Sequence, residues 1–561
     1  MTEEAAYANP ILSGFYPDPS ICRVGGDFYL VNSTFAYFPG IPVHRSRDLV
    51  HWELIGHALD RPSQLNLDGA GHSRGLFAPT IRHHEGTFYL TCTNVDAGGN
   101  FIVTAKDPAG PWSDPVWLED APGIDPSLFF DEDGRCWYCG TRPAPEGERY
   151  PGNWEIWLRE LDLATLRLTG EARGIWRGAL RDCVWPEGPH LYKKDGRYYL
   201  LIAEGGTGAD HAVSVARSDA LSGPWEGKPS NPILTHRHLG SGAPIVNVGH
   251  GDLVEDGTGD WWMTLLASRR FGGDFTVLGR ETFLVPVVWE DGWPVPSPGS
   301  GRVETSYPAP RLPPDSLPAE SACEHFEDPS LDPRWIFLRT PRSEFYSLSE
   351  RPGFLRLKLL PATLRENAAA SFVGRRLRHG EWQARTSVEF VPAADNETAG
   401  LVLLQSNDFQ YRLELARSPS LSPSRTAGRS QARTPSRTVI STADRTVIRL
   451  VVAEGGADRV IAERPFPGDR AVLAVESRSG ELCFRFGATP GNLELLASGV
   501  DGSVVSTERA GGFVGTVIGI FASGDIFASG DIFASGDIFA SGDGFASDNR
   551  ADFDWFEYGP L

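Results

Sequence analysis

Five short stretches with a common pattern recur through the first half of the chain, at intervals of about 50–65 residues. Each has an acidic or glycine-containing turn followed by paired aromatic residues, which is typical of a β-hairpin. The stretches are GGDFYLV (25–31), EGTFYLT (85–91), EDGRCWYCG (132–140), DGRYYLLI (195–202) and GTGDWWMTLL (257–266). One such unit cannot bury both of its faces alone, as in a propeller blade. Residues 1–300 are therefore predicted to form a five-bladed β-propeller.

A second signature precedes each hairpin by about ten residues: YPDPSI, APTI, DPSLFF, EGPHLY and GHGDLV. Aligning the hairpins superposes Asp18, Ala78, Asp125, Glu187 and His250. Equivalent positions of successive blades converge on the propeller axis, so three carboxyl groups are expected close together. Carboxylates held close together raise each other's pKa. A purely structural domain avoids that arrangement, whereas a catalytic acid–base site uses it. Each signature alone is explained by ordinary turn chemistry. Their occurrence at the same position of every repeat favours an acid–base site instead.

The composition argues against several functional classes. Of the 561 residues, 52 are Lys or Arg and 73 are Asp or Glu, for a formal net charge of −21. Nucleic acids and anionic membranes need a basic face, so we expect neither as a partner. No apolar run approaches the ~20 residues of a membrane helix. The first residues lack a secretory signal, so we expect a cytoplasmic protein. The only CxxC, Cys136 and Cys139, is a weak metal signal, and reduced thiols are favoured.

A Pro-rich segment separates the two halves of the sequence, and residues 301–320 are predicted to be a stiff linker. Residues 321–561 again alternate apolar and polar positions, with turns every 8–12 residues, which is typical of a β-sandwich. Helical periodicity is almost absent from the whole chain. The sequence therefore predicts an all-β protein with an N-terminal propeller and a C-terminal sandwich.

Two segments interrupt the second half. Residues 417–446 are rich in Ser, Arg and Pro and nearly devoid of apolar side chains, so we expect a long surface loop there. The hexamer IFASGD occurs four times in succession over 520–543. Such identity indicates a tandem in-frame duplication, either natural or an artefact of sequence assembly, with a stacked solenoid as the alternative.

Longer motifs resemble those of the two-domain β-xylosidases of glycoside hydrolase family 43. They are NPILSGFYPDPSI, GLFAPTI, GIDPSLFFDEDG, WPEGPHLYKKDGRYYLLIAEGG, GHGDLVED and LGRETFLVPVVWEDGWPV, and the similarity runs from about Asn9 to Val295. LDPRWIFLRTP, RPGFLRL and ADFDWFEY resemble the family's C-terminal sandwich. The resemblance implies a five-bladed β-propeller followed by a concanavalin-like, lectin-like jelly roll.

The resemblance also implies roles for individual residues. Asp18 matches the general base, Glu187 the general acid, and Asp125 the third carboxylate, which orients the acid and keeps its pKa high. The resemblance further implies five substrate-binding residues: Arg280, His250, Phe35, Phe77 and Phe513. Phe77 departs from the tryptophan usual before Ala-Pro, which puts the fit of the sugar there in doubt.

Structural alternatives stay open for four of these substrate-binding residues. Arg280 could be an ordinary ion-pair residue at a strand end. His250 could be a hydrogen-bonded core residue, or it could lie in the shell of a structural Ca²⁺, as in some members of the family. Phe35 and Phe77 could simply be core residues. No cofactor is expected to be required.

The leading functional hypothesis is an exo-acting β-D-xylosidase that releases xylose from xylobiose and short xylo-oligosaccharides by inverting, single-displacement hydrolysis. An acid and a base about 6.5–9.5 Å apart, with water between them, suit that reaction. One alternative is an α-L-arabinofuranosidase, alone or as a second activity. An alternative of another class is a non-catalytic carbohydrate-binding propeller. The sequence leaves the oligomeric state open, including a homo-oligomer.

Overall fold

The computed structural model describes residues 5–240, 242–318, 320–418, 446–524 and 547–561. Most of the predicted insert 417–446 and of the IFASGD repeat lies outside these residues. The chain divides into two compact units: the first contains Met1–Ala319, Arg376–Arg378 and Gly512–Gly515, and the second contains the remainder. The regular secondary structure of the described residues is almost entirely β-strand. No helix within it has the length and apolar character needed to cross a bilayer.

Five antiparallel sheets make up most of the described part of the first unit, each formed by consecutive segments of the chain. The blades are formed by β2 (Ser20–Val24), β3 (Asp27–Val31), β5 (Gly40–Ser46) and β6 (Glu53–Leu59); by β7 (Thr80–His84), β8 (Thr87–Asn94), β9 (Gly99–Ala105) and β10 (Val116–Trp117); by β11 (Ile124–Phe130), β12 (Cys136–Pro143), β13 (Trp154–Asp162) and β14 (Arg167–Trp176); by β15 (Glu187–Lys194), β16 (Arg197–Glu204), β17 (Ala212–Ser218), β18 (Glu226–Gly227) and β19 (Leu234–Thr235); and by β20 (Ile245–Glu255), β21 (Trp261–Arg269), β22 (Glu281–Glu290) and β23 (Trp293–Pro296). The short strand β4 (Tyr37–Phe38) lies between β3 and β5 in the sequence.

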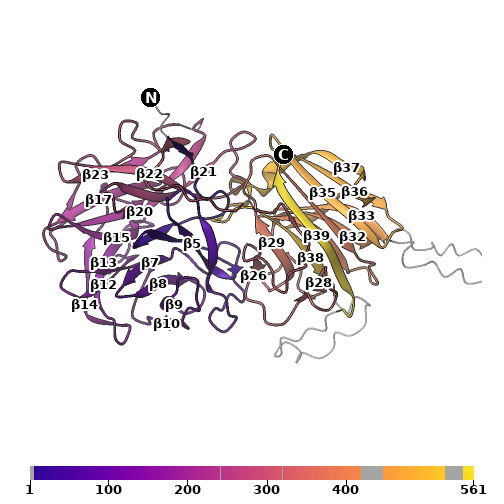
Figure 1. Cartoon of the computed structure of the whole chain (residues 1–561), viewed down its shortest axis with the longest axis horizontal. Coiled ribbons are helices and arrows are strands. Elements are labelled where there is room, and N and C mark those ends of the chain that lie inside the picture. The colour runs from indigo at the N-terminus through magenta and orange to yellow at the C-terminus, as the bar shows by residue number, and fades with distance from the viewer. Residues whose placement is uncertain (1–4, 241, 319, 419–445, 525–546) are drawn as a thin grey trace, which may run out of the picture. The chain divides into compact units, whose positions relative to one another are not determined.

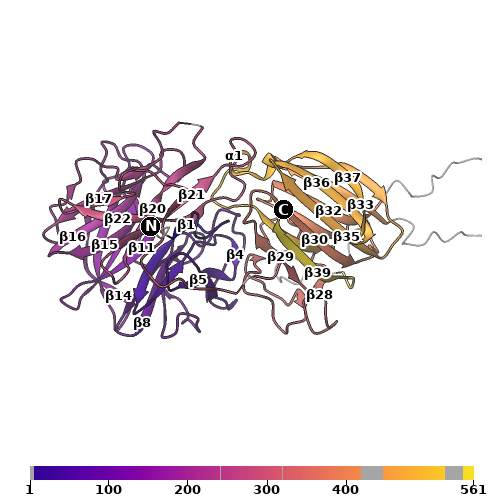
Figure 2. The ribbon, with the colours of Figure 1, turned by 45° about the horizontal axis from the view of Figure 1, so that its top comes forward.

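The first strands of the five blades contact one another in a closed ring. β2 contacts β7, β7 contacts β11, β11 contacts β15, β15 contacts β20, and β20 contacts β2. The aromatic pairs of the repeat lie on the second strand of each blade. Two of these strands are β8, labelled in Figure 1, and β16, labelled in Figure 2. The ring and the blades together form the predicted five-bladed propeller.

The start of the chain is bound to the fifth blade. Tyr7 Oη and Asn9 Nδ2 each donate a hydrogen bond of 2.8 Å to the carbonyl oxygen of Leu284 in β22. Leu284 N donates back to Asn9 Oδ1 at 2.9 Å. β1 (Ala6–Ala8) also pairs with β24 (Ser306–Pro308), which lies within the predicted linker. The beginning and the end of this unit are thereby held together.

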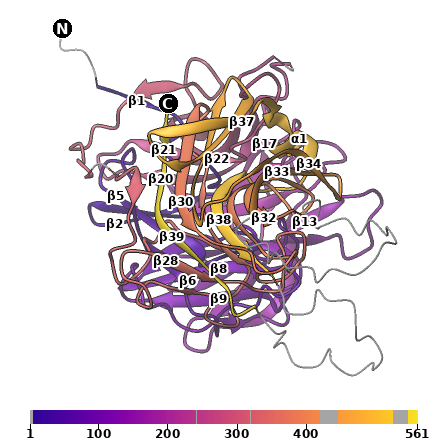
Figure 3. The same ribbon diagram turned by 90° about the vertical axis from the view of Figure 1, so that its right-hand side faces the viewer.

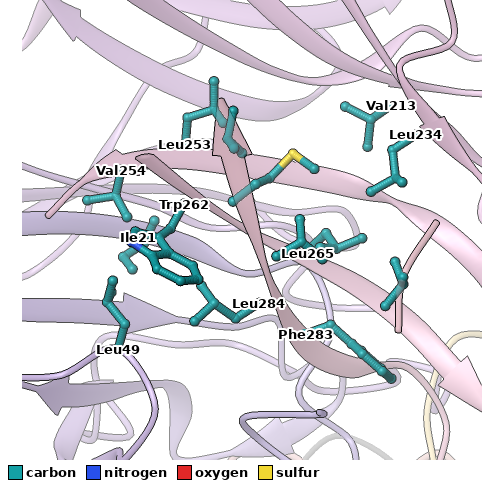
Figure 4. Close-up of a cluster of buried hydrophobic side chains, with 14 of the residues drawn as sticks. Ile21, Leu49, Val213, Leu234, Leu253, Val254, Trp262, Leu265, Phe283 and Leu284 are labelled. Carbon is teal, nitrogen blue, oxygen red and sulfur yellow. The ribbon is translucent and has the colours of Figure 1, made fainter. Parts of the chain in front are cut away.

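A large apolar cluster fills the space between the last blades and the first (Figure 4). Leu265 and Phe283 are fully buried, and Trp262 packs beside Ile21 and Leu49 of the first blade. Burying one such side chain contributes roughly 1.5–3 kcal/mol, so the cluster is a main stabilising feature of ring closure.

The described part of the second unit contains two antiparallel sheets, as a sandwich requires. One has the order β27-β28-β39-β30-β35-β36-β37, with β25 paired to β39, and the other has the order β29-β38-β31-β32-β33-β34. Figure 3 shows β39 beside β30 in the first sheet and β32 beside β33 in the second. Along β36, the buried side chains Leu482, Phe484 and Phe486 alternate with more exposed ones, as expected for a sheet with one buried face.

The elements of the second half are β25 (Cys323–Glu324), β26 (Phe337–Leu338), β27 (Tyr346–Ser347), β28 (Leu355–Lys358), β29 (Ser371–Arg376), β30 (Trp382–Glu389), β31 (Thr398–Leu404), β32 (Phe409–Arg417), β33 (Thr446–Glu454), β34 (Ala457–Pro465), β35 (Arg470–Arg478), β36 (Glu481–Thr489), β37 (Asn492–Asp501), the 3-10 helix η3 (Gly502–Val505), α1 (Thr507–Ala510), β38 (Val517–Ser523) and β39 (Arg550–Pro560). All seven cysteines are free thiols, and Cys136 and Cys139 are buried.

Candidate active site

The five positions that the repeat superposes all line one pocket of the first unit, one from each blade. They are Asp18, Ala78, Asp125, Glu187 and His250. The other described residues that line the pocket are Phe35, Phe77, Ile124, Thr207, His211, Arg280 and Phe513. All eight predicted site residues therefore lie around a single pocket. Sequence reasoning did not find Ile124, Thr207 or His211.

Local backbone irregularity directs several of these side chains. Asp18, Asp125 and His250 have φ values of 52°, 53° and 50°, in the left-handed region that non-glycine residues rarely adopt. The ladder registers of β11, β15 and β20 shift at or beside Asp125, Glu187 and His250. A bulge re-aims a side chain that regular pleating would direct elsewhere. The strain at these positions is typical of functional sites.

Asp18 is buried, with 5% of its surface exposed, and is surrounded by groups that favour its charged form. Ser33 Oγ donates a hydrogen bond of 2.5 Å to Asp18 Oδ2, and Arg280 Nη1 donates one of 2.9 Å to Oδ1. Burial by itself raises the pKa of Asp18. Arg280, His250 and the Ser33 hydroxyl together outweigh burial, so the pKa lies below its ordinary value. Asp18 is therefore an ionised carboxylate able to accept a proton.

Glu187 has the opposite electrostatic environment. Burial, followed by the nearby carboxylates Asp125 and Asp18, raises its pKa well above the ordinary value. Burial also raises the pKa of Asp125 to about 6; Asp18 adds to this rise, and His250 opposes it. Asp125 Oδ2 accepts a hydrogen bond of 3.1 Å from the backbone N–H of Gly188, which directly follows Glu187. Glu187 thus retains its proton at a pH where Asp18 has lost its own.

Arg280 joins several parts of the pocket. Besides Asp18, its guanidinium donates to Thr207 Oγ1 at 2.9 Å and to the carbonyl oxygen of Phe513 at 3.3 Å. Its side chain is 10% exposed. Arg280 therefore forms an ion pair with Asp18 and also lines the pocket. Its buried positive charge lies next to the hydroxyl of Thr207.

Three aromatic rings form an apolar wall. The ring centroids of Phe35 and Phe77 lie 5.3 Å apart, and those of Phe35 and Phe513 lie 5.9 Å apart. The backbone N–H of Phe513 donates a hydrogen bond of 2.8 Å to Ser73 Oγ. This bond holds the segment Gly512–Gly515 in place within the first unit. Aromatic faces of this kind suit the apolar face of a sugar ring.

His250 lies close against the chain that carries the proposed acid. A side chain on Gly188, whose φ is +55°, would place its Cβ 2.8 Å from His250 Cε1. Only glycine fits both this backbone conformation and this close approach. The His250 ring also meets His190 edge-on, with centroids 6.5 Å apart.

Around His250, the described side chains form no cluster of metal-ligating groups. Within the described ranges, no group of three or more His, Cys, Asp or Glu side chains could hold a metal ion. Calcium takes six to eight oxygen ligands in proteins. The buried carboxylate of Asp252, two residues after His250, already accepts hydrogen bonds from Ser20, Ile21, Arg82 and Tyr192.

Comparison with known proteins decides the family. Residues 7–294 match the family model described as glycosyl hydrolases family 43. The chain belongs to glycoside hydrolase family 43. Residues 323–532 match the model of the β-xylosidase C-terminal concanavalin A-like domain, so the second unit is the sandwich of this family. The predictions of family, of fold class and of a glycosidase are confirmed.

Relatives of the glycoside hydrolase cover nearly its whole length. It is 48% identical to a xylosidase/arabinosidase of Butyrivibrio fibrisolvens, over 92% of this chain and 95% of that protein. It is 37% identical to a non-reducing end α-L-arabinofuranosidase of Bacteroides ovatus, over 99% and 95%. The crystal structure of a xylan β-1,4-xylosidase from Bacillus halodurans is similar with a TM-score of 0.85 and 33% identity, over 98% of this chain and 99% of that one.

Proposed function

We propose that this glycoside hydrolase is an exo-acting β-D-xylosidase that releases xylose from xylobiose and short xylo-oligosaccharides with inversion at the anomeric carbon. The observation that carries the proposal is the contrast between two carboxyl groups in one pocket. The pKa of Asp18 is lowered, whereas that of Glu187 is raised. One ionised and one protonated carboxyl group are what single displacement needs at its two ends.

In the proposed reaction, Asp18 takes a proton from a water molecule as the water oxygen bonds to the anomeric carbon. The bond from that carbon to the glycosidic oxygen breaks, and Glu187 gives its proton to the departing oxygen. Asp18 ends protonated and Glu187 ends ionised, so one proton exchange with solvent resets the pair. Asp125 holds the pKa of Glu187 high and fixes its strand through Gly188.

The remaining lining residues suit the recognition of one terminal sugar. The pocket has an empty volume of about 400 Å³, its mouth included. Phe35, Phe77 and Phe513 offer apolar faces, and Arg280 and Thr207 offer polar groups for the sugar hydroxyls. A pocket of this size and lining favours attack at the end of a chain.

The names of relatives support the pentose substrate. The Butyrivibrio fibrisolvens protein is a xylosidase/arabinosidase, and proteins of Escherichia coli and Bacillus subtilis are named as a putative β-xylosidase and a β-xylosidase. Because one relative acts on α-L-arabinofuranosides by name, we propose arabinofuranosidase activity as the second candidate. The same three carboxyl groups would serve either pentose.

The experiment is hydrolysis of xylobiose followed by NMR of the anomeric protons from the first minute. The proposal predicts α-xylose before mutarotation sets in. Early β-xylose would contradict Asp18 as base, because retention requires a nucleophile in its place. With no release from xylobiose but release from an α-L-arabinofuranoside, the second candidate replaces the first.

The variant Glu187→Gln tests the assignment of Glu187 as the acid. This variant should lose at least 100-fold in turnover of xylobiose. It should still bind xylose in calorimetry, because the pocket walls are intact. A variant that hydrolyses xylobiose as fast as the wild type would reject Glu187 as the acid.

A further inference from the structure

The carboxylate of Asp252 lies in β20, two residues after His250, and its side chain has no exposed surface. Its Oδ2 accepts hydrogen bonds from Ser20 Oγ at 2.8 Å, Ile21 N at 3.0 Å and Arg82 Nη1 at 2.9 Å. Its Oδ1 accepts from Tyr192 Oη at 2.6 Å and from Arg82 Nη2 at 3.1 Å. A carboxylate has about four lone-pair positions, so the hydrogen-bonding capacity of Asp252 is filled.

These donors come from different blades. Ser20 and Ile21 belong to β2, Arg82 to β7 and Tyr192 to β15. One side chain on β20 therefore ties four of the five innermost strands to one another. The fifth strand, β11, joins this set where Asp125 accepts the hydrogen bond from Gly188 of β15.

The tied positions closely follow the pocket residues along the same strands. Ser20 comes two residues after Asp18, and Tyr192 comes five after Glu187. A strand rises about 3.3 Å per residue, so the contacts made by Asp252 lie within a few residues of the proposed base and acid. A shift between β2 and β15 at this level would change the spacing of Asp18 and Glu187.

The charge of Asp252 is balanced inside the protein. A buried carboxylate without a partner is strongly destabilising. Arg82 is a positively charged partner that binds Asp252 through two hydrogen bonds, in bidentate fashion. Burial opposes ionisation, but Arg82, His190 and Tyr192 together lower the pKa of Asp252. Arg82 Nη2 also donates to His190 Nδ1 at 3.0 Å, which holds the ring that meets His250. With every lone pair of Asp252 in use, no oxygen of this carboxylate is left for a metal ion.

We infer that the Arg82–Asp252 pair, called the hub below, positions Asp18 and Glu187 by linking the innermost strands. In this inference the guanidinium of Arg82, and not a metal ion, supplies the positive charge beside Asp252. Both residues are positioning residues, because neither lines the pocket. The kinetic consequence of this inference rests on the proposed hydrolysis, whereas its independence of metal does not.

The first arm of the test compares Arg82→Met with Arg449→Met at a temperature well below the melting point of either variant. Arg449 pairs with Glu414 at 2.8 Å in the second unit, and the exposures of the two pairs are similar: 22% and 2% there, 16% and 0% at the hub. Both variants should melt at lower temperature. Only Arg82→Met should lose turnover of 4-nitrophenyl β-D-xyloside, on the order of 100-fold with KM little changed, since small misplacement of reacting groups costs that much.

Two further variants keep the test informative if Arg82→Met folds poorly. Arg82→Lys keeps the charge without the planar fork and should recover part of the turnover. The double variant Arg82→Met/Asp252→Leu should melt at a higher temperature than Arg82→Met, because no unpaired charge stays buried. Equal turnover in Arg82→Met and Arg449→Met would reduce the hub to a structural role and overturn the positioning claim.

The second arm needs no variant and no substrate. The calcium content of the wild-type protein is first measured by elemental analysis before any chelation. The protein is then dialysed against EDTA, and its melting temperature is recorded with and without added Ca²⁺. The inference predicts less than one bound calcium per ten chains and an unchanged melting temperature. A fall on chelation that Ca²⁺ reverses would show that a metal supports this fold, and would overturn the metal-free claim. If xylosides are not cleaved by the wild type, the proposed function fails while this arm stands.

Discussion

The guanidinium of Arg280 and the carboxylate of Asp18 form a buried ion pair, with Nη1 2.9 Å from Oδ1. The pair joins the loop before β22 to the residues that lead into β2, so it also connects the fifth blade to the first. Because the positive charge opposes the effect of burial on Asp18, it contributes to the lowered pKa of this carboxyl group. A residue that lines the sugar pocket thus also controls the proposed base.

The first prediction concerns the pH dependence of Arg280→Met. Loss of the guanidinium raises the pKa of Asp18, so the acid limb of kcat/KM against pH moves to higher pH, by roughly 1–3 pH units. Arg280 also opposes the raised pKa of Glu187, so the basic limb moves upward as well. Arg280→Lys keeps a positive charge and should leave both limbs close to the wild type. An acid limb that stays in place in Arg280→Met would mean that Asp18 is not the group whose ionisation limits the reaction.

The second prediction concerns the basic limb. Asp125→Asn removes a negative charge that raises the pKa of Glu187. The proposed acid then loses its proton at lower pH, and the basic limb of kcat/KM moves downward, opposite to the shift in Arg280→Met. Turnover at the optimum also falls, because Asp125 helps to place the strand of Glu187. The check is a full pH profile with 4-nitrophenyl β-D-xyloside; a basic limb that is unmoved or displaced upward speaks against the assignment.

The same variant tests the stability cost of the buried carboxyl group. The pKa of Asp125 is raised from 3.8 to about 6 in the folded protein, so the folded state holds a proton that the unfolded chain releases. The contribution of Asp125 to stability therefore falls as pH rises from about 4 to about 6 and stays lower above that range, by up to about 3 kcal/mol. Asn cannot ionise, so Asp125→Asn should melt several degrees higher than the wild type at pH 7.5. The melting temperatures of the two proteins should differ least near pH 4. A melting temperature of the variant below that of the wild type at pH 7.5 would contradict a raised pKa of Asp125.

Local sequence patterns predicted the framework of this fold well. The aromatic hairpins mark the second strand of every blade, and their common phase brings Asp18, Ala78, Asp125, Glu187 and His250 to one pocket. Within the described part of the second unit, the predicted alternation of apolar and polar positions is present in strands such as β36, but not in β34 and β37. β34 and β37 have mostly exposed side chains and therefore lack a clear apolar alternation.

Contacts between blades were not predictable from such patterns. Thr207 and His211 reach the pocket from the turn between β16 and β17, and no short-range signal separates them from ordinary turn residues. Arg82 and Asp252 are 170 residues apart, and their pairing depends on the register of two strands in different blades. One-dimensional spacing contains no information on that register. The tandem hexamer and the Ser/Arg/Pro-rich insert stay predictions, because they lie mostly outside the described residues.

The last prediction uses two glycines of the fourth blade that share a left-handed backbone. Gly188 has φ +55°, and an added Cβ would lie 2.8 Å from His250 Cε1; Gly196 has φ +77° and no atom within 4 Å of its added Cβ. Either alanine substitution introduces similar backbone strain, worth about 1–2 kcal/mol. Gly188→Ala alone must also displace His250 or the strand that begins at Glu187, so its kcat/KM should fall at least tenfold while that of Gly196→Ala is unchanged. Melting curves verify that both variants are folded, and equal activities of the two would show that close packing of Gly188 against His250 is not needed for catalysis.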